Sequence, residues 1–151
     1  MFYLGIDPGK SGAVAVVDAD GNLLLVFDTP LIGRDYDAGE MVDFLTEHRE
    51  SRAALEIQHA MPKQGVSSTF TTGYGYGLWY MALTALGIPF DLVRSQDWKR
   101  ALGIPAGRDK ADSVAAAQRL FPGGDFTGPR GGVKDGRAEA CLLAEYRRRQ
   151  G

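Results

Sequence analysis

Residues 2–28 read FYLGIDPGKSGAVAVVDADGNLLLVFD, and this stretch decides the fold. It contains three runs rich in apolar and β-branched residues, at 2–7, 12–18 and 22–28, which are separated by short segments with Gly, Pro and Asp. The Asp-Gly pair at 20–21 is a hairpin signal between two strands. The stretch therefore predicts an antiparallel meander of three strands.

Further strands and helices alternate after the meander. Asp37 resembles the start of a capping box before a helix that runs to about residue 49, and Ser95 is expected to cap a short helix. The other elements expected are strands at 52–57 and 89–93, and helices from residue 67 or 68 to 86, from 109 to 121 and from 134 to 149. Later strands need crossover connections, which predicts an α/β fold with a mixed five-stranded sheet and helices on both faces.

Length and composition are those of a soluble globular protein, with 151 residues, 44% hydrophobic and 24% charged. We expect one domain over residues 1–151, because a chain of this length buries one sizeable core. No membrane-spanning stretch or secretory signal is apparent, which favours a cytoplasmic location. Cys141, His48 and His59 are too few for a zinc site, so a metal would be held by oxygen.

Charge is distributed unevenly along the chain. Residues 1–93 carry 5 Lys and Arg against 12 Asp and Glu, whereas residues 94–151 carry 12 against 7. A basic half can contact phosphates, and an acidic half can hold the carboxylates of a cation site. Ordinary scatter combined with a basic C-terminal tail, Arg147 to Arg149, explains the charges equally well.

Four acidic residues are candidates for one catalytic site. Asp7 ends the first strand before Pro8-Gly9, and Glu56 closes an apolar strand in which Glu is unfavourable. Asp135 and Glu139 are four residues apart and share one face of the last helix. Taken singly, each has an ordinary explanation as a turn residue, an exposed strand end, a helix-dipole partner or a surface acid.

Together the four acids predict a site for a hard divalent cation. Strand-end and helical carboxylates would converge if the two strands were neighbours and the last helix packed over their ends. Such a cluster suits Mg²⁺, with Mn²⁺ as an alternative, and two ions at one site can support hydrolysis of a phosphodiester. We therefore predict Asp7, Glu56, Asp135 and Glu139 as catalytic and metal-binding residues.

Three motifs contain the predicted acids: GIDPGKSGAVAVVD at 5–18, LEIQ at 55–58 and KDGRAEACLLA at 134–144. They resemble, in this order, the first motif, the second motif and the C-terminal helix of one nuclease family, the RuvC type of Holliday junction resolvase. The likeness of the helix is greatest to phage-encoded relatives. DWKRALGI at 97–104, and the helix that starts at 109–110 and ends in LFP, also resemble the family. The likeness spans essentially the whole chain, with the motifs in order.

The resemblance implies an RNase H-like fold, a homodimer and paired symmetric nicks in a four-way DNA junction, in host-cell cytoplasm if the protein is phage-encoded. The last helix departs from the bacterial pattern, where two acids lie three residues apart, so Asp135 is the first choice as ligand and Glu139 the second. His59 stands where the family has an aromatic residue that reaches the junction centre. An imidazole can also stack on a base, although a loop His is more often simply exposed.

Basic residues near these motifs are predicted to contact DNA phosphates. With His59, the candidates are Lys10, Lys63, Lys99, Arg100, Arg108, Lys110, Lys134 and Arg137. Solvated surface is the alternative for all of them. The aromatics Tyr74, Tyr76, Trp79 and Tyr80 are interpreted as one packing stripe on their Gly-rich helix, with dimer contact implied by the resemblance.

Other functional classes remain as alternatives. A flap or fork nuclease would use the same acids, and a non-catalytic junction-binding module would keep them without function. The actin, heat-shock and sugar-kinase ATPases share the Gly-Ile-Asp-x-Gly opening, but they place two such domains around a nucleotide, and this chain has room for one.

Overall fold

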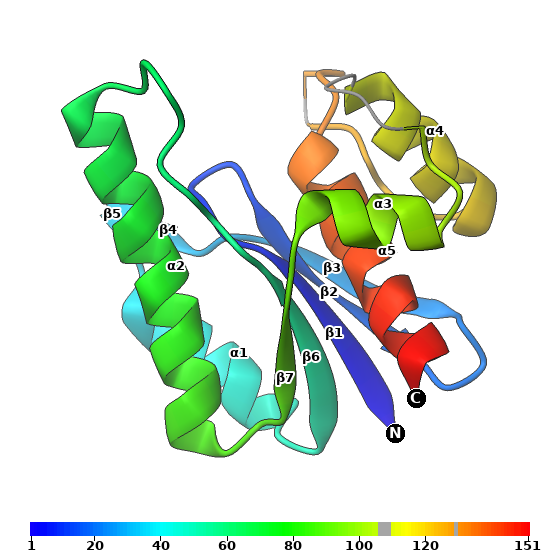
Figure 1. Ribbon diagram of the computed structural model, residues 1–151. Coiled ribbons are helices and arrows are strands. Elements are labelled where there is room, and N and C mark those ends of the chain that lie inside the picture. The colour runs from blue at the N-terminus through cyan, green and yellow to red at the C-terminus, as the bar shows by residue number, and fades with distance from the viewer. Residues whose placement is uncertain (106–109, 129) are drawn as a thin grey trace.

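A five-stranded sheet forms the centre of the computed structural model, which describes residues 1–105, 110–128 and 130–151 (Figure 1). The strand order is β3-β2-β1-β6-β7. Neighbours β1, β2 and β3 pair antiparallel, as the meander predicts, whereas β6 and β7 are parallel to β1. The strands are β1 Phe2–Asp7, β2 Ala13–Asp18, β3 Leu23–Asp28, β6 Ser51–Glu56 and β7 Phe90–Val93.

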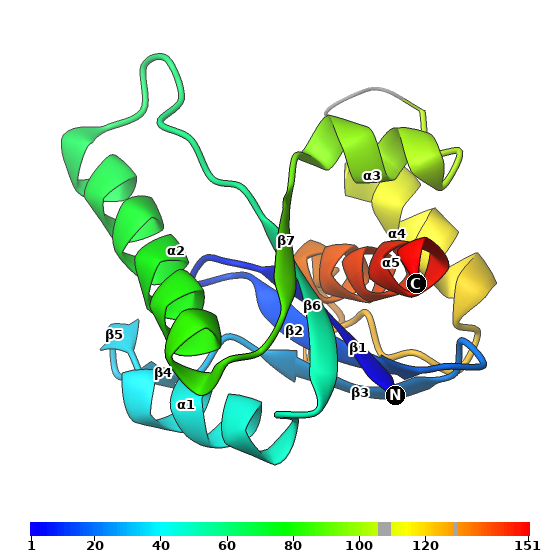
Figure 2. The same ribbon diagram turned by 60° about the horizontal axis from the view of Figure 1, so that its bottom comes forward.

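Helices cover both faces of the sheet, which confirms the predicted architecture (Figures 1 and 2). One face carries α1, Ala38–Glu47, and α2, Val66–Leu86. The opposite face carries α3, α4 and α5, which span Ser95–Ala101, Lys110–Leu120 and Asp135–Gln150. None of the helices in the described ranges is long and apolar enough to span a membrane.

The two faces of the sheet differ in the size of their side chains. On β2, Val14 and Val16 pack toward α1 and α2, while Ala13 and Ala15 pack toward α5. Alternation follows from the two-residue period of a strand. Small residues on the second face let α5 approach closely, and Gly5 of β1 shows how closely. A Cβ at Gly5 would lie 2.1 Å from the backbone oxygen of Ala140 in α5.

Local signals place most element ends, with a few differences. Asp37 caps α1 as predicted, by accepting a hydrogen bond from the Glu40 amide at 3.0 Å. The prediction that Ser95 caps α3 is wrong, because Arg94 is the N-cap residue and Ser95 is the first residue of the helix. The predicted helix start at Asp109 lies outside the described residues, which resume with Lys110.

A two-stranded hairpin, β4 Leu31–Ile32 and β5 Asp35–Tyr36, was not predicted, since two-residue strands leave no periodic pattern. Tyr36 from this hairpin packs against Gly75 of α2, where a Cβ would lie 2.3 Å from the tyrosine ring. Gly destabilises the interior of a helix, but Gly75 allows this close packing.

Candidate active site

Asp7 and Glu56 end two neighbouring parallel strands. Ile6 of β1 pairs with Leu55 of β6, so the next residue of each strand, Asp7 and Glu56, emerges at the same carboxyl edge of the sheet. Side chains at this edge of an open α/β sheet point to the usual place for ligands. Glu56 is only 9% exposed, which is unusual for a Glu without a charged partner.

The first turn of α5 brings the other two acids to the same edge. Gly136 makes this possible, because a Cβ there would lie 2.2 Å from the backbone oxygen of Ser11 in the β1–β2 turn. The helix therefore begins in backbone contact with the turn that follows Asp7. Asp135 and Glu139, one helical turn apart, both border this contact.

All four predicted acids line one pocket of about 560 Å³. The Pro8 to Gly12 turn and hydroxyl-bearing residues of α2 also line it. The lining residues used below are Asp7, Lys10, Glu56, Lys110, Asp135 and Glu139, with Ser68, Thr71 and Thr72 from α2. The pocket is thus lined by acids from β1, β6 and α5 and by uncharged polar residues from α2.

Burial and the neighbouring acids shift the pKa values of two carboxyl groups in this pocket. Burial, followed by the charges of Glu56, Glu139 and Asp135, raises the pKa of Asp7 well above its usual range. Burial also raises the pKa of Glu56 from 4.5 to about 7, although a hydrogen bond from Trp98 opposes the increase. Such carboxylates are held at an energetic cost that a bound cation would relieve.

Two lysines partly balance the acids. Lys110 Nζ lies 2.6 Å from Asp135 Oδ2, and Lys99 Nζ lies 3.3 Å from Glu139 Oε1. Within the described residues, no group of three or more His, Cys, Asp and Glu side chains is arranged to hold a metal ion. The acids therefore share a pocket without forming a closed cage, and two of them hold ammonium groups instead.

Two residues that fix these acids were not singled out from the sequence. Trp98 of α3 is fully buried and donates from its indole nitrogen to Glu56 Oε2 at 2.7 Å. Ser113 of α4 donates to Glu139 Oε1 at 3.3 Å. A buried indole usually finds a hydrogen-bond acceptor, so Trp98 within the charged run DWKR was the available signal.

The predicted DNA-binding lysines and arginines fall into different environments. Lys10 and Lys110 border the pocket, while Lys99 beside Glu139 is only 16% exposed. Lys134 and Arg137 form ion pairs with Asp28, and Arg137 is largely enclosed. We therefore leave Arg137 out of the proposed DNA contacts.

The remaining predicted contacts either do not line the pocket or fall outside the described residues. His59 and Lys63 are exposed on the segment between β6 and α2 and do not line the pocket. Arg100 is exposed on α3, with Asp97 at 3.9 Å, and Arg108 lies outside the described residues. Their contacts with DNA stay predictions.

The chain is similar in sequence to a known protein. No protein-family model matches the chain. The chain is 31% identical over 92 residues to the Holliday junction resolvase MOC1, chloroplastic, of Chlamydomonas reinhardtii, an alignment that covers 61% of this chain and 10% of that protein. The chain thus corresponds to a small part of that relative.

Solved structures of RuvC from Thermus thermophilus share the fold. A RuvC structure matches with a TM-score of 0.70 at 18% identity, over 97% of this chain and 92% of that one. RuvC in complex with a Holliday junction substrate matches with a TM-score of 0.72 at 19% identity, over 100% and 97%. The resemblance predicted from the motifs is confirmed: this chain has an RNase H-like fold and is similar to the RuvC type of Holliday junction resolvase.

Proposed function

We propose that this protein is a divalent-metal-dependent endonuclease that resolves four-way DNA junctions by paired symmetric nicks. The observation that carries the proposal is the meeting of Asp7, Glu56, Asp135 and Glu139 in one pocket, from three elements distant in sequence. Likeness to the Chlamydomonas resolvase and to RuvC with its junction substrate supports branched DNA as the substrate class.

The donor set of the pocket fits Mg²⁺, with Mn²⁺ as a substitute. Its four acids offer carboxylate oxygens, the ligands that hard cations prefer, and burial together with repulsion from the other three acids raises the pKa of Asp7. Asp7, Glu56 and Asp135 would hold the ions, with Glu139 as a further ligand. When bound, two such ions supply an activated water and stabilise the leaving oxygen of a phosphodiester.

The chain's own residues prepare the site for hydrolysis. Trp98 holds Glu56 in one orientation through its 2.7 Å hydrogen bond. Lys110, whose side chain is 73% exposed, lines the pocket and would supply positive charge for a phosphate. In the reaction, a water oxygen bonds to phosphorus as one ester P–O bond breaks, and the leaving oxygen is protonated.

Paired nicks require two active sites, and α2 carries a surface suited to a second copy of the chain. Val66, Phe70 and Met81 are 88%, 73% and 63% exposed and lie on one face of the helix. Gly73 and Gly77 lie on the same face with open space before them, which allows a close approach. The four aromatics that were predicted to form one packing stripe do not all lie on this face, because Trp79 is fully buried in the core.

A change in this exposed face tests the homodimer. Phe70→Asp places a charge on this face and is expected to give a monomer in sedimentation velocity. Leu24→Asp, at a residue 53% exposed on β3, is the matched control and should leave the dimer intact. A wild-type protein that sediments as a monomer at micromolar concentration would contradict the proposed dimer.

Cleavage of a panel of DNA substrates tests the function. We expect nicks in a four-way junction with Mg²⁺, at symmetric positions on opposing strands, and none with EDTA. Flaps, forks and linear duplex serve as comparisons. Equal cutting of flaps or linear duplex would indicate a less selective nuclease, and binding without cutting in either metal would indicate a junction-binding module.

A further inference from the structure

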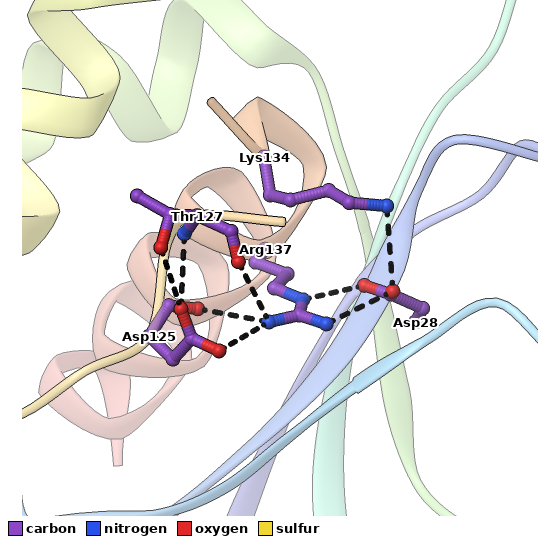
Figure 3. A network of polar contacts seen from close by, with 5 residues as sticks. All are labelled: Asp28, Asp125, Thr127, Lys134 and Arg137. Carbon is purple, nitrogen blue, oxygen red and sulfur yellow. Dashed lines mark hydrogen bonds and ion pairs between the residues drawn. The ribbon is translucent and has the colours of Figure 1, made fainter. Parts of the chain in front are cut away.

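Arg137 stands at the centre of a network of polar contacts (Figure 3). It lies on α5 between Asp135 and Glu139, and its side chain turns toward the end of β3. Its partners come from two segments: Asp28 at the end of β3, and Asp125 and Thr127 from the loop before α5.

The contacts of Arg137 engage all three of its guanidinium nitrogens. Nε and Nη2 donate to the two oxygens of Asp28, at 2.6 and 3.0 Å. Nη1 donates to Asp125 Oδ2 at 2.9 Å and to the backbone oxygens of Asp125 and Thr127 at 3.3 and 3.4 Å. This paired geometry matches a guanidinium and cannot be reproduced by a lysine.

The loop partners are themselves fixed. Asp125 Oδ1 accepts hydrogen bonds from the amide and the hydroxyl of Thr127, both at 3.1 Å. Thr127 pairs with Val133 in an isolated β-bridge, and the Lys134 amide donates to the oxygen of Phe126 at 2.8 Å. These hydrogen bonds therefore fix the loop oxygens that accept hydrogen bonds from Arg137.

The start of α5 depends on such external support. Its N-cap residue, Lys134, makes no side-chain capping hydrogen bond, so the first helical turn lacks the usual local stabilisation. This same turn carries Asp135 and leads to Glu139. Arg137 is 18% exposed, and its partner Asp28 is 42% exposed, so the ion pair is partly shielded from water.

We propose that Arg137 is a positioning residue, which clamps the uncapped first turn of α5 between β3 and the 125–127 loop and thereby sets Asp135 and Glu139 over Asp7. The role goes beyond the sequence-based prediction of a DNA contact, because the guanidinium is already engaged by two carboxylates. The proposed role of Arg137 rests on the proposed function only in its expected effect on catalysis.

The test compares Arg137→Gln with a matched change at the other end of the same helix. Arg148 pairs with Glu145 through Nε and Nη2, at 2.8 and 2.9 Å, so Arg148→Gln removes a similar ion pair far from the acids. Hydrogen exchange of the 135–140 amides is expected to accelerate in Arg137→Gln and not in Arg148→Gln. This measurement needs neither metal nor DNA, so it remains decisive even if the protein proves not to be a nuclease.

Metal binding and kinetics supply the second readout. In Arg137→Gln, Mn²⁺ affinity in DNA-free calorimetry and kcat for the junction are each expected to fall about 10- to 100-fold, with KM unchanged. Arg137→Lys is expected to behave like Arg137→Gln. If a folded Arg137→Gln is not obtained, Asp28→Asn is expected to show the same changes in smaller degree.

Two results would overturn the inference. Unchanged exchange of the 135–140 amides in Arg137→Gln would show that the clamp does not hold the turn. A raised KM with kcat unchanged, restored by Arg137→Lys, would assign Arg137 to phosphate binding instead.

Discussion

Asp7→Asn is expected to reduce junction cleavage by on the order of 10³-fold or more while junction binding is kept, because one ligand of the proposed cation site loses its charge at constant size. The charges of the other three acids each raise the pKa of Asp7, in addition to the larger effect of burial. Single-turnover cleavage in Mg²⁺ and binding in EDTA measure the two properties separately. Cleavage by Asp7→Asn at the wild-type rate would remove the proposed mechanism.

The same substitution is expected to stabilise the metal-free protein. The pKa of Asp7 is raised in the folded state, so its ionised form is less favourable there than in the unfolded chain. The free energy of unfolding therefore falls as pH rises above the pKa that Asp7 has in the unfolded chain. Glu56, whose pKa is raised from 4.5 to about 7, lowers it further between these two pH values. In EDTA at neutral pH, Asp7→Asn should melt at a higher temperature than wild type, and this difference should shrink at acidic pH.

Gly136→Ala is expected to have the second large effect. Its Cβ would lie 2.2 Å from the Ser11 oxygen and 2.9 Å from Gly12 Cα, both backbone atoms that have little freedom to move. The start of α5 must shift, at a cost of about 1–3 kcal/mol, and Asp135 moves with it. A displacement near 1 Å costs about 100-fold in rate, so kcat should fall far more than the loss of stability alone predicts.

Gly39→Ala is the matched control for this change. Gly39 is the second residue of α1, as Gly136 is of α5, but its Cβ would meet only Asp37 Oδ1 at an ordinary 3.4 Å. This control should retain cleavage and gain a few tenths of a kcal/mol, up to about 1, from the higher helix propensity of Ala. Denaturant unfolding and single-turnover cleavage measure both variants. Equal kcat for Gly136→Ala and Gly39→Ala would contradict the proposed role of the α5–turn contact.

Strand and helix positions in this protein follow from local signals in the chain. The meander, the Asp37 cap and the end of α2 at Gly87, which has a φ of 68°, are set by residues within one or two turns of the backbone. The strand-end placement of Asp7 and Glu56 is equally local. Short-range sterics and hydrogen bonds decide such features, so a single sequence reveals them.

Which acids meet, and what surrounds them, depends on contacts between distant segments. Close backbone contacts at Gly5 and Gly136 hold α5 against β1 and the turn that follows it. This position of α5 brings Glu139 into contact with Lys99 and Ser113. Arg137 illustrates the difference: its sequence context beside the acids indicated a DNA contact, whereas the fold places Asp28 and Asp125 around it. A charged side chain binds whichever opposite charge the packing brings within reach, and that is a property of the assembled layers of the structure.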